Sequence, residues 1–246
     1  MEICGFELAK KLKEKGFNED CYTVYNTATM RIERSLTTWK GRINNPDLPK
    51  VLYSIFRQET KYKFKVVMTL STVDFPNKEK DLCDALNLFI EEHLIEIIWV
   101  NDNTRALKKI CPIMDLYPDT PILTTDDDIF LLKNAVETFM NVHQQNPKCI
   151  LTELGHRLVD KDEICTGSFR LFPPHSLYKL SSDYFMKYFE VYEDDVYMAI
   201  LAKLEGSKTL ILKKGICYEI KTQSYNASAL NRIYRKIPWR KCRQNL

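Results

Sequence analysis

Three consecutive aspartates, Asp126, Asp127 and Asp128, directly follow an apolar stretch that ends in Thr124-Thr125. In an extended chain alternate side chains share a face, so we expect Asp126 and Asp128 on one side and Asp127 on the other. Neighbouring carboxylates repel each other and raise each other's pKa unless a cation lies between them. Mg²⁺ or Mn²⁺ suits such oxygens, which predicts a metal site at Asp126 and Asp128. The alternative is that one aspartate caps a helix that begins near Leu131.

A second acidic group, Glu193-Asp194-Asp195, precedes an apolar run that starts at Val196. An aspartate at the start of a helix stabilises it by about 1 kcal/mol through capping and the helix dipole. If it faces the same cleft as the first group, a carboxylate here is instead a general base that takes the proton from an attacking hydroxyl. The residues alone leave both interpretations open.

The elements that must position these groups alternate between strand and helix along the centre of the chain. Apolar runs predict strands over 65–70, 95–100, 121–125 and 149–152, and amphipathic patterns predict helices over 47–57, 80–93, 105–116 and 131–145. This order predicts βαβ units in a mainly parallel sheet flanked by helices, with ligands bound at the carboxyl ends of the strands. The loops after Leu70, Val100 and Thr125 are therefore the expected place for chemistry.

The flanking regions are less regular. Turn residues make 155–174 irregular, a helix is expected from Asp194 or Asp195 to Leu204 with Gly206 ending it, and short strands are expected at 209–212 and 216–220. Near the amino terminus we expect a helix in the first 30 residues and a strand over 32–38. These patterns divide the chain into a helical extension (1–30), an α/β domain (31–220) and a basic tail (221–246).

The order of the motifs resembles a known family. The segments that carry the resemblance are Ser35-Leu36-Thr37-Thr38-Trp39, Val67-Met68-Thr69-Leu70-Ser71, Ile98-Trp99-Val100-Asn101-Asp102-Asn103, Tyr117-Pro118-Asp119 leading into the three aspartates, and Asp194-Asp195-Val196 before a helix. Together they are similar to bacterial glycosyltransferases of the GT-A (Rossmann-like) fold, of the family-2 type, over roughly residues 32–205. The run from Tyr117 to Asp128 and the later Asp-Asp-Val are the most specific parts.

The resemblance implies roles for individual residues. It implies Asp126 and Asp128 at the metal and the donor diphosphate, Asp127 close to the sugar or ribose, and Asp195 as the base with Asp194 as its neighbour. It also implies nucleotide contacts from Thr37, Thr38 and Ser71, and an approach of Lys108 or Lys109 to the diphosphate as a point charge. For the two lysines the competing interpretation is a solvated helix face. A Gly-rich acceptor segment typical of the family is replaced here by Thr166-Gly167-Ser168-Phe169-Arg170, so the acceptor contacts stay unassigned.

The implied function is a metal-dependent glycosyltransferase, of the hexosyltransferase type, in cell-surface polysaccharide synthesis. It would move a sugar from a nucleotide-diphosphate donor, with UDP-sugar favoured, to a hydroxyl of a glycan or lipid-linked acceptor, with inversion and with Mn²⁺ or Mg²⁺. One alternative is a haloacid-dehalogenase-like phosphohydrolase, although that motif lies near the amino terminus and has Thr or Val where this chain has Phe130. The other is a non-enzymatic α/β module that binds a divalent ion.

The charge distribution separates the tail from the rest of the chain. The 246 residues carry 36 Lys and Arg against 33 Asp and Glu, a formal net charge of +3. Glu219 is the last acidic residue, and seven basic residues follow it. Residues 1–219 therefore hold 29 of the 36 basic residues and all 33 acidic residues, a formal net charge of about −4. This balance argues against a nucleic-acid-binding domain. Over 228–239 the basic tail is amphipathic, which fits either an anionic membrane surface or a helix packed on the domain.

The cysteines and the apolar runs bear on the cellular compartment of the protein. The eight cysteines form no C-x-x-C pair, and the start of the chain does not have the pattern of a secretory signal. No apolar run approaches the roughly 18 residues needed to span a bilayer. We therefore expect reduced thiols in a cytoplasmic protein, with the tail as a candidate peripheral contact at the inner face of the cytoplasmic membrane.

Overall fold

The computed structural model describes residues 48–101, 104–153, 156–157, 163–164, 169–188, 194–212 and 215–219. The predicted amino-terminal helix, the strand over 32–38 with Thr37 and Thr38, and the basic tail lie outside these ranges.

The first part of the described chain is a parallel strand pair with two helices. Its elements are α4 (Leu48–Phe56), β1 (Val66–Ser71), the 3₁₀ helix η1 (Lys78–Asp81), α5 (Asp84–Glu91) and β2 (Ile95–Val100). β1 and β2 run parallel, with Val66 opposite Ile95 and Ser71 opposite Val100. One apolar cluster joins α4, β1, α5 and the start of β2. The predicted strand–helix–strand order is confirmed here, and β2 has its predicted bounds.

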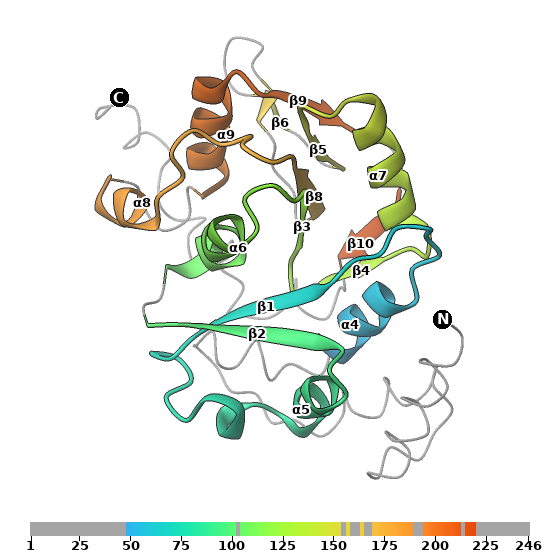
Figure 1. Ribbon diagram of the computed structural model, residues 1–246, viewed down its shortest axis with the longest axis vertical. Helices are drawn as coiled ribbons and strands as arrows, with labels where there is room; N and C mark the ends of the chain where they lie inside the picture. Colours follow the sequence, from blue (N-terminus) through green and yellow to red (C-terminus); the bar gives the residue numbers. More distant parts are fainter. Residues whose placement is uncertain are drawn as a thin grey trace.

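A four-stranded sheet forms the second part (Figure 1). Its strands lie in the order β3 (Ile122–Thr125), β8 (Phe169–Phe172), β5 (Cys149–Thr152) and β9 (Lys208–Ile211). β8 is antiparallel to both of its neighbours, whereas β5 and β9 are parallel. The chain is therefore a mixed α/β protein, and the prediction of a mainly parallel sheet is wrong for this sheet. β8 lies in a stretch predicted to be irregular because turn residues surround it, but all four of its residues are buried.

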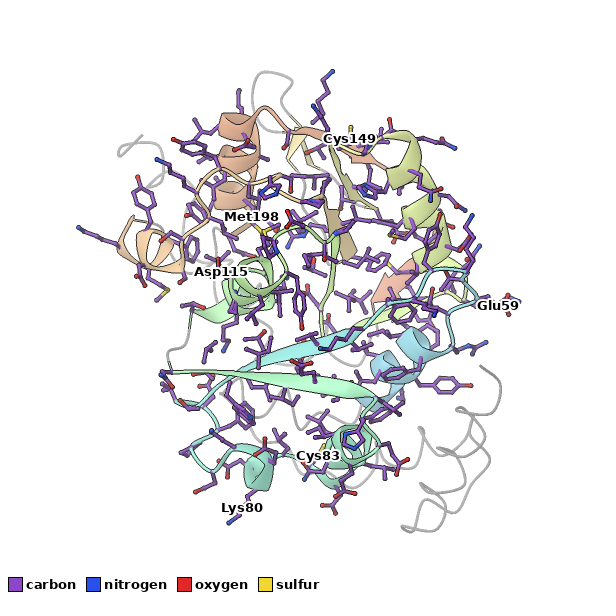
Figure 2. All side chains as sticks on the ribbon, in the orientation of Figure 1. Glu59, Lys80, Cys83, Asp115, Cys149 and Met198 are labelled. Atoms are coloured by element: carbon purple, nitrogen blue, oxygen red, sulfur yellow. The ribbon has the colours of Figure 1, made fainter. Side chains whose placement is uncertain are left out.

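Helices cover both faces of this sheet (Figure 1). α7 (Ala135–Gln145) packs on one face against a cluster that includes Leu151, Phe169 and Leu171. On the other face α6 (Cys111–Leu116), α8 (Ser182–Tyr188) and α9 (Asp194–Glu205) pack against a cluster that includes Ile150 and Phe172. Figure 2 shows side chains filling the space between α9 and α6, where Met198 lies.

The predicted helix over 131–145 begins later than expected. Ile129–Leu131 is a strand, β4, which pairs antiparallel with β10 (Cys217–Glu219), and α7 starts only at Ala135. Ile129 and Leu131 are buried while Phe130 between them is less buried, so the local period is that of a strand. The three aspartates consequently lie in a turn between β3 and β4 and do not cap α7. The turn is closed by the Ile129 N–H, which donates to the Asp126 carbonyl at 3.3 Å.

The remaining elements agree with the sequence patterns or add to them. α9 and its end at Gly206 are confirmed, and Gly206 has a φ of +78°, which favours glycine at a helix end. The predicted helix over 105–116 is split into the 3₁₀ helix η2 (Arg105–Lys109) and α6. A short antiparallel pair, β6 (His156–Arg157) and β7 (Glu163–Ile164), completes the described strands. Among the described residues, no helix has the length and apolar character needed to cross a membrane.

The described cysteines, Cys83, Cys111, Cys149 and Cys217, form no disulfide. Burial raises the pKa of the Cys111 thiol to about 12, so this group is an unreactive part of the core.

Two buried polar side chains at the end of α4 hold the turn of the three aspartates in place. The Ser54 hydroxyl accepts from the Leu131 N–H at 3.0 Å. The Gln58 side-chain amide donates to the Leu132 carbonyl at 2.8 Å, and its oxygen accepts from the Val136 N–H at 3.0 Å in the first turn of α7. Gln58 therefore satisfies a helix-start N–H that has no partner within the helix.

We predict that Gln58→Ala lowers the free energy of unfolding by roughly 1–3 kcal/mol, because it leaves the buried Val136 N–H without its partner. Lys133→Ala is the control, since it removes only the exposed pair with Glu59, which extends outward at the edge of the molecule in Figure 2. This change should cost no more than about 0.5 kcal/mol. Urea denaturation of both variants checks the difference, and equal costs would contradict the assigned role of Gln58.

Candidate functional site

The carboxyl end of β3 and the end of η2 are joined by an ion pair. Lys109 Nζ lies 2.6 Å from Asp126 Oδ1. Both side chains are partly exposed, 24% for Lys109 and 33% for Asp126, so this pair borders solvent. The distance is that of a charge-assisted hydrogen bond.

A second ion pair joins the centre of the sheet to α9. Arg170 in β8 is 1% exposed, and its Nη1 lies 2.5 Å from Asp195 Oδ1 in the first turn of α9. In the sheet Arg170 lies opposite Thr124 on β3 and Thr152 on β5, and all three are buried. Burying an unpaired guanidinium costs several kcal/mol, so the pair with Asp195 offsets that cost and sets where α9 begins.

Asp194 connects the two ion pairs. Burial raises the pKa of its carboxyl above the ordinary value of 3.8, the charges of Lys109 and Arg170 lower it, and those of Asp195 and Asp126 raise it. Asp194 therefore lies within electrostatic range of all four charged groups. The two acidic motifs are distant in sequence, and the fold brings them into one site, as the sequence interpretation of a shared cleft required.

The two lysines of η2 point to different partners. In a 3₁₀ helix successive residues are about 120° apart, so Lys108 and Lys109 leave the helix in different directions. Lys108 is buried at 8% exposure, and its Nζ lies 3.4 Å from Asp74 Oδ2 in the turn after β1. The competing prediction of a solvated helix face is wrong for Lys108 and does not fit the paired Lys109.

Ser71 lies at the carboxyl end of β1, where the sequence places a donor contact. The residue is fully buried, and its hydroxyl accepts from the Val73 N–H at 3.1 Å. Its carbonyl accepts from the Phe75 N–H at 3.0 Å. These bonds shape the turn that carries Asp74 toward Lys108, and a direct contact of Ser71 with a nucleotide stays a prediction.

The backbone of the three aspartates departs from the expected extended form. Asp127 and Asp128 are turn residues, so the extended backbone from which the alternation of faces was predicted is absent here. A common position of Asp126 and Asp128 stays a prediction. The assignment of Asp127 to the sugar or ribose stays a prediction.

Whether these residues suit a metal ion follows from their partners. Mg²⁺ or Mn²⁺ would use the carboxylate oxygens of Asp126 and Asp128, which are of the right chemical type. However, one oxygen of Asp126 is already bonded to the Lys109 ammonium. Within the described ranges, no three His, Cys, Asp or Glu residues are grouped so as to hold one ion. The arrangement therefore does not fit a bound divalent ion while Lys109 holds Asp126.

Arg170 is the residue of this charged cluster that sequence reasoning missed. The resemblance placed it in a segment without assignable contacts, and the surrounding turn residues hid the strand. A signal was present, because Arg170 is a single charge within the apolar run Phe169 to Phe172. A charge in a buried strand requires a partner, and Asp195 provides it.

A separate pocket of about 250 Å³ lies near the start of β3. It is lined by residues of the loop after α6 and of the turn after β8, including Tyr117, Thr120, Pro174 and Ser176. None of the sequence-predicted site residues lines it, so it is distinct from the charged cluster.

Comparisons with known proteins give no family. No protein-family model matches the chain, and no curated protein matches it. A solved structure of UDP-glucose pyrophosphorylase complexed with UDP-glucose is similar with a TM-score of 0.42 and 12% identity, covering 80% of this chain and 89% of that chain. An apo UDP-glucose pyrophosphorylase gives a TM-score of 0.42 and 11% identity, with the same coverage.

We predict that Asp194→Asn raises the free energy of unfolding at pH 7. The folded protein holds the Asp194 proton more tightly than the unfolded chain does. The wild type therefore loses stability as the pH rises from about 3.8, and the loss is complete above the folded-state pKa. The amide cannot ionise, so the advantage of the variant should shrink toward pH 4. Chemical denaturation between pH 4 and 8 measures it, and an advantage that does not change with pH would contradict the raised pKa.

Proposed function

We propose that this chain is a nucleotide-sugar-dependent glycosyltransferase of GT-A type. It transfers a sugar from a nucleotide-diphosphate donor, with UDP-sugar favoured, to a hydroxyl of a glycan or lipid-linked acceptor. The observation that carries the proposal is Asp194, a carboxyl with a raised pKa that lies within electrostatic range of Asp126 and Asp195 and of the ion pairs that these form with Lys109 and Arg170. The resemblance of the sequence motifs to GT-A enzymes supplies the substrate class.

The raised pKa of Asp194 supports a change in the expected division of roles. A general base works best when its pKa is near the operating pH, and burial moves the pKa of Asp194 in that direction. Asp195 was expected as the base, but one of its oxygens is engaged by Arg170. We assign proton acceptance to Asp194 and the anchoring of the first turn of α9 to Asp195.

The reaction then balances in one displacement. The acceptor oxygen forms a bond to the anomeric carbon, and its proton passes to the Asp194 carboxylate. The bond from the anomeric carbon to the diphosphate oxygen breaks, and its electron pair leaves with the nucleotide diphosphate. Attack from the face opposite the leaving group inverts the anomeric centre. Lys109 lies at the edge of the cluster, where its positive charge would favour the charge developing on the leaving group.

Two finer points belong to the same proposal. A role in cell-surface polysaccharide synthesis follows from the resembling bacterial family. Contact of the tail, residues 221–246, with an anionic membrane follows from its basic amphipathic sequence.

Donor binding tests the substrate class. We expect calorimetry with UDP, GDP and their sugar conjugates, each with and without Mn²⁺, to detect binding of at least one nucleotide diphosphate. Because Asp126 adjoins the proposed diphosphate position, Asp126→Ala should change that affinity. Failure to bind any nucleotide diphosphate or nucleotide-sugar under either condition would overturn the proposal.

Turnover tests the base. We predict that Asp194→Asn lowers kcat by about 10²–10⁴-fold and leaves donor affinity within a few fold, because the amide cannot accept the proton. Asp183→Asn is the matched control, since Asp183 also lies in the first turn of a helix but is exposed. It should keep wild-type turnover. A larger loss in Asp195→Asn than in Asp194→Asn, in proteins of equal stability, would return the role of base to Asp195.

A further inference from the structure

We propose that Lys109 supplies, from within the chain, the cation that the acidic cluster requires, so that Asp126 is held by an ammonium group in place of a divalent metal ion. The inference rests on the proposed function in one respect, namely that the donor diphosphate lies at Asp126. It departs from the sequence-based expectation of Mn²⁺ or Mg²⁺ at Asp126 and Asp128. The same physical requirement, a cation between neighbouring carboxyls, leads to both ideas.

The position of the ammonium matches this role. Lys109 Nζ is 2.6 Å from Asp126 Oδ1 at the end of β3. The ammonium also acts on Asp194: after burial, which raises the pKa of Asp194, the charge of Lys109 has the largest effect, ahead of Asp195, Arg170 and Asp126. One ammonium group therefore interacts electrostatically with carboxyls from both acidic motifs.

The backbone around Lys109 is held on both sides. Leu107 and Ile110 are fully buried in the core beneath α9. Lys108 is buried and paired with Asp74. Because these neighbours anchor η2, the Lys109 side chain starts from a defined place beside the aspartate turn.

An ammonium group can do part of what a metal ion does in such a site. It carries three N–H donors, and the bond to Asp126 uses one of them. A second can be donated to a phosphate oxygen, so that Lys109 would bridge a carboxylate and a diphosphate. A divalent ion at Asp126 would have to displace Lys109 or lie next to its positive charge, and both are unfavourable.

Binding of Mn²⁺ alone, in the absence of nucleotide, tests the proposal. We expect the wild type to show no Mn²⁺-dependent rise in Tm up to millimolar concentration. Lys109→Met keeps the length of the side chain and removes its charge, and it should bind Mn²⁺ at least tenfold more tightly than the wild type by calorimetry. Lys109→Arg keeps the charge and should behave as the wild type.

One further variant tests where the Mn²⁺ ion binds, and another controls for the loss of a lysine charge. Lys109→Met combined with Asp126→Asn should lose the gained Mn²⁺ binding, because the vacated carboxylate is then absent. Lys133→Met removes an exposed lysine whose Nζ lies 3.0 Å from Glu59 Oε1, and it should gain nothing. Circular dichroism confirms that each variant is folded.

Three results would overturn the inference: Mn²⁺ binding by the wild type that is as tight as in Lys109→Met, no gain in Lys109→Met, or a gain that survives Asp126→Asn. If Lys109→Met does not fold, wild-type Mn²⁺ binding that is lost in Asp126→Asn decides against the inference, and no such binding supports it. Because no nucleotide is present, these outcomes are independent of the donor-binding and turnover tests.

Discussion

A guanidinium group in the middle of a buried strand constrains the rest of the site. Arg170 lies on β8 between two neighbouring strands and has almost no contact with water, so its charge must be met by the protein. Asp195 meets it from the first turn of α9. This pair places the start of α9 over the sheet, and Asp194, its neighbour in the chain, is thereby brought beside Lys109 and Asp126.

The aspartate turn has its own support, separate from the Arg170–Asp195 pair. Its position depends on β4, which begins one residue after Asp128, and β4 is tied to α4 through Ser54 and Gln58. The bonds from Leu131 to Ser54 and from Val136 to Gln58 are buried, so the protein loses much more by breaking them than by losing an exposed pair. The site therefore rests on two separate polar connections, the Arg170–Asp195 pair and the bonds of Ser54 and Gln58.

Asp194 shows how stability and chemistry oppose each other here. Burial of its carboxyl disfavours the charged form, and the adjacent Asp195 adds to this effect, while Lys109 and Arg170 act against it. A carboxyl in such surroundings costs folding free energy at neutral pH, yet it is a better proton acceptor than an exposed aspartate. The cations limit the cost without removing the perturbation, so Asp194 keeps the raised pKa that its proposed role as a base requires.

Local pattern in the sequence determined the elements with a strong period and the residues worth examining. β2, α9 with its end at Gly206, and the two acidic motifs were all predictable, because apolar periodicity and capping residues act within a few positions. Only the tertiary structure decided that β8 enters the sheet antiparallel and that Lys109 meets Asp126. It also decided that Arg170 meets Asp195. These pairings join residues distant in the chain, and they depend on which strands lie side by side and which charges are removed from water. No local pattern encodes that choice, since it follows from the packing of the whole domain.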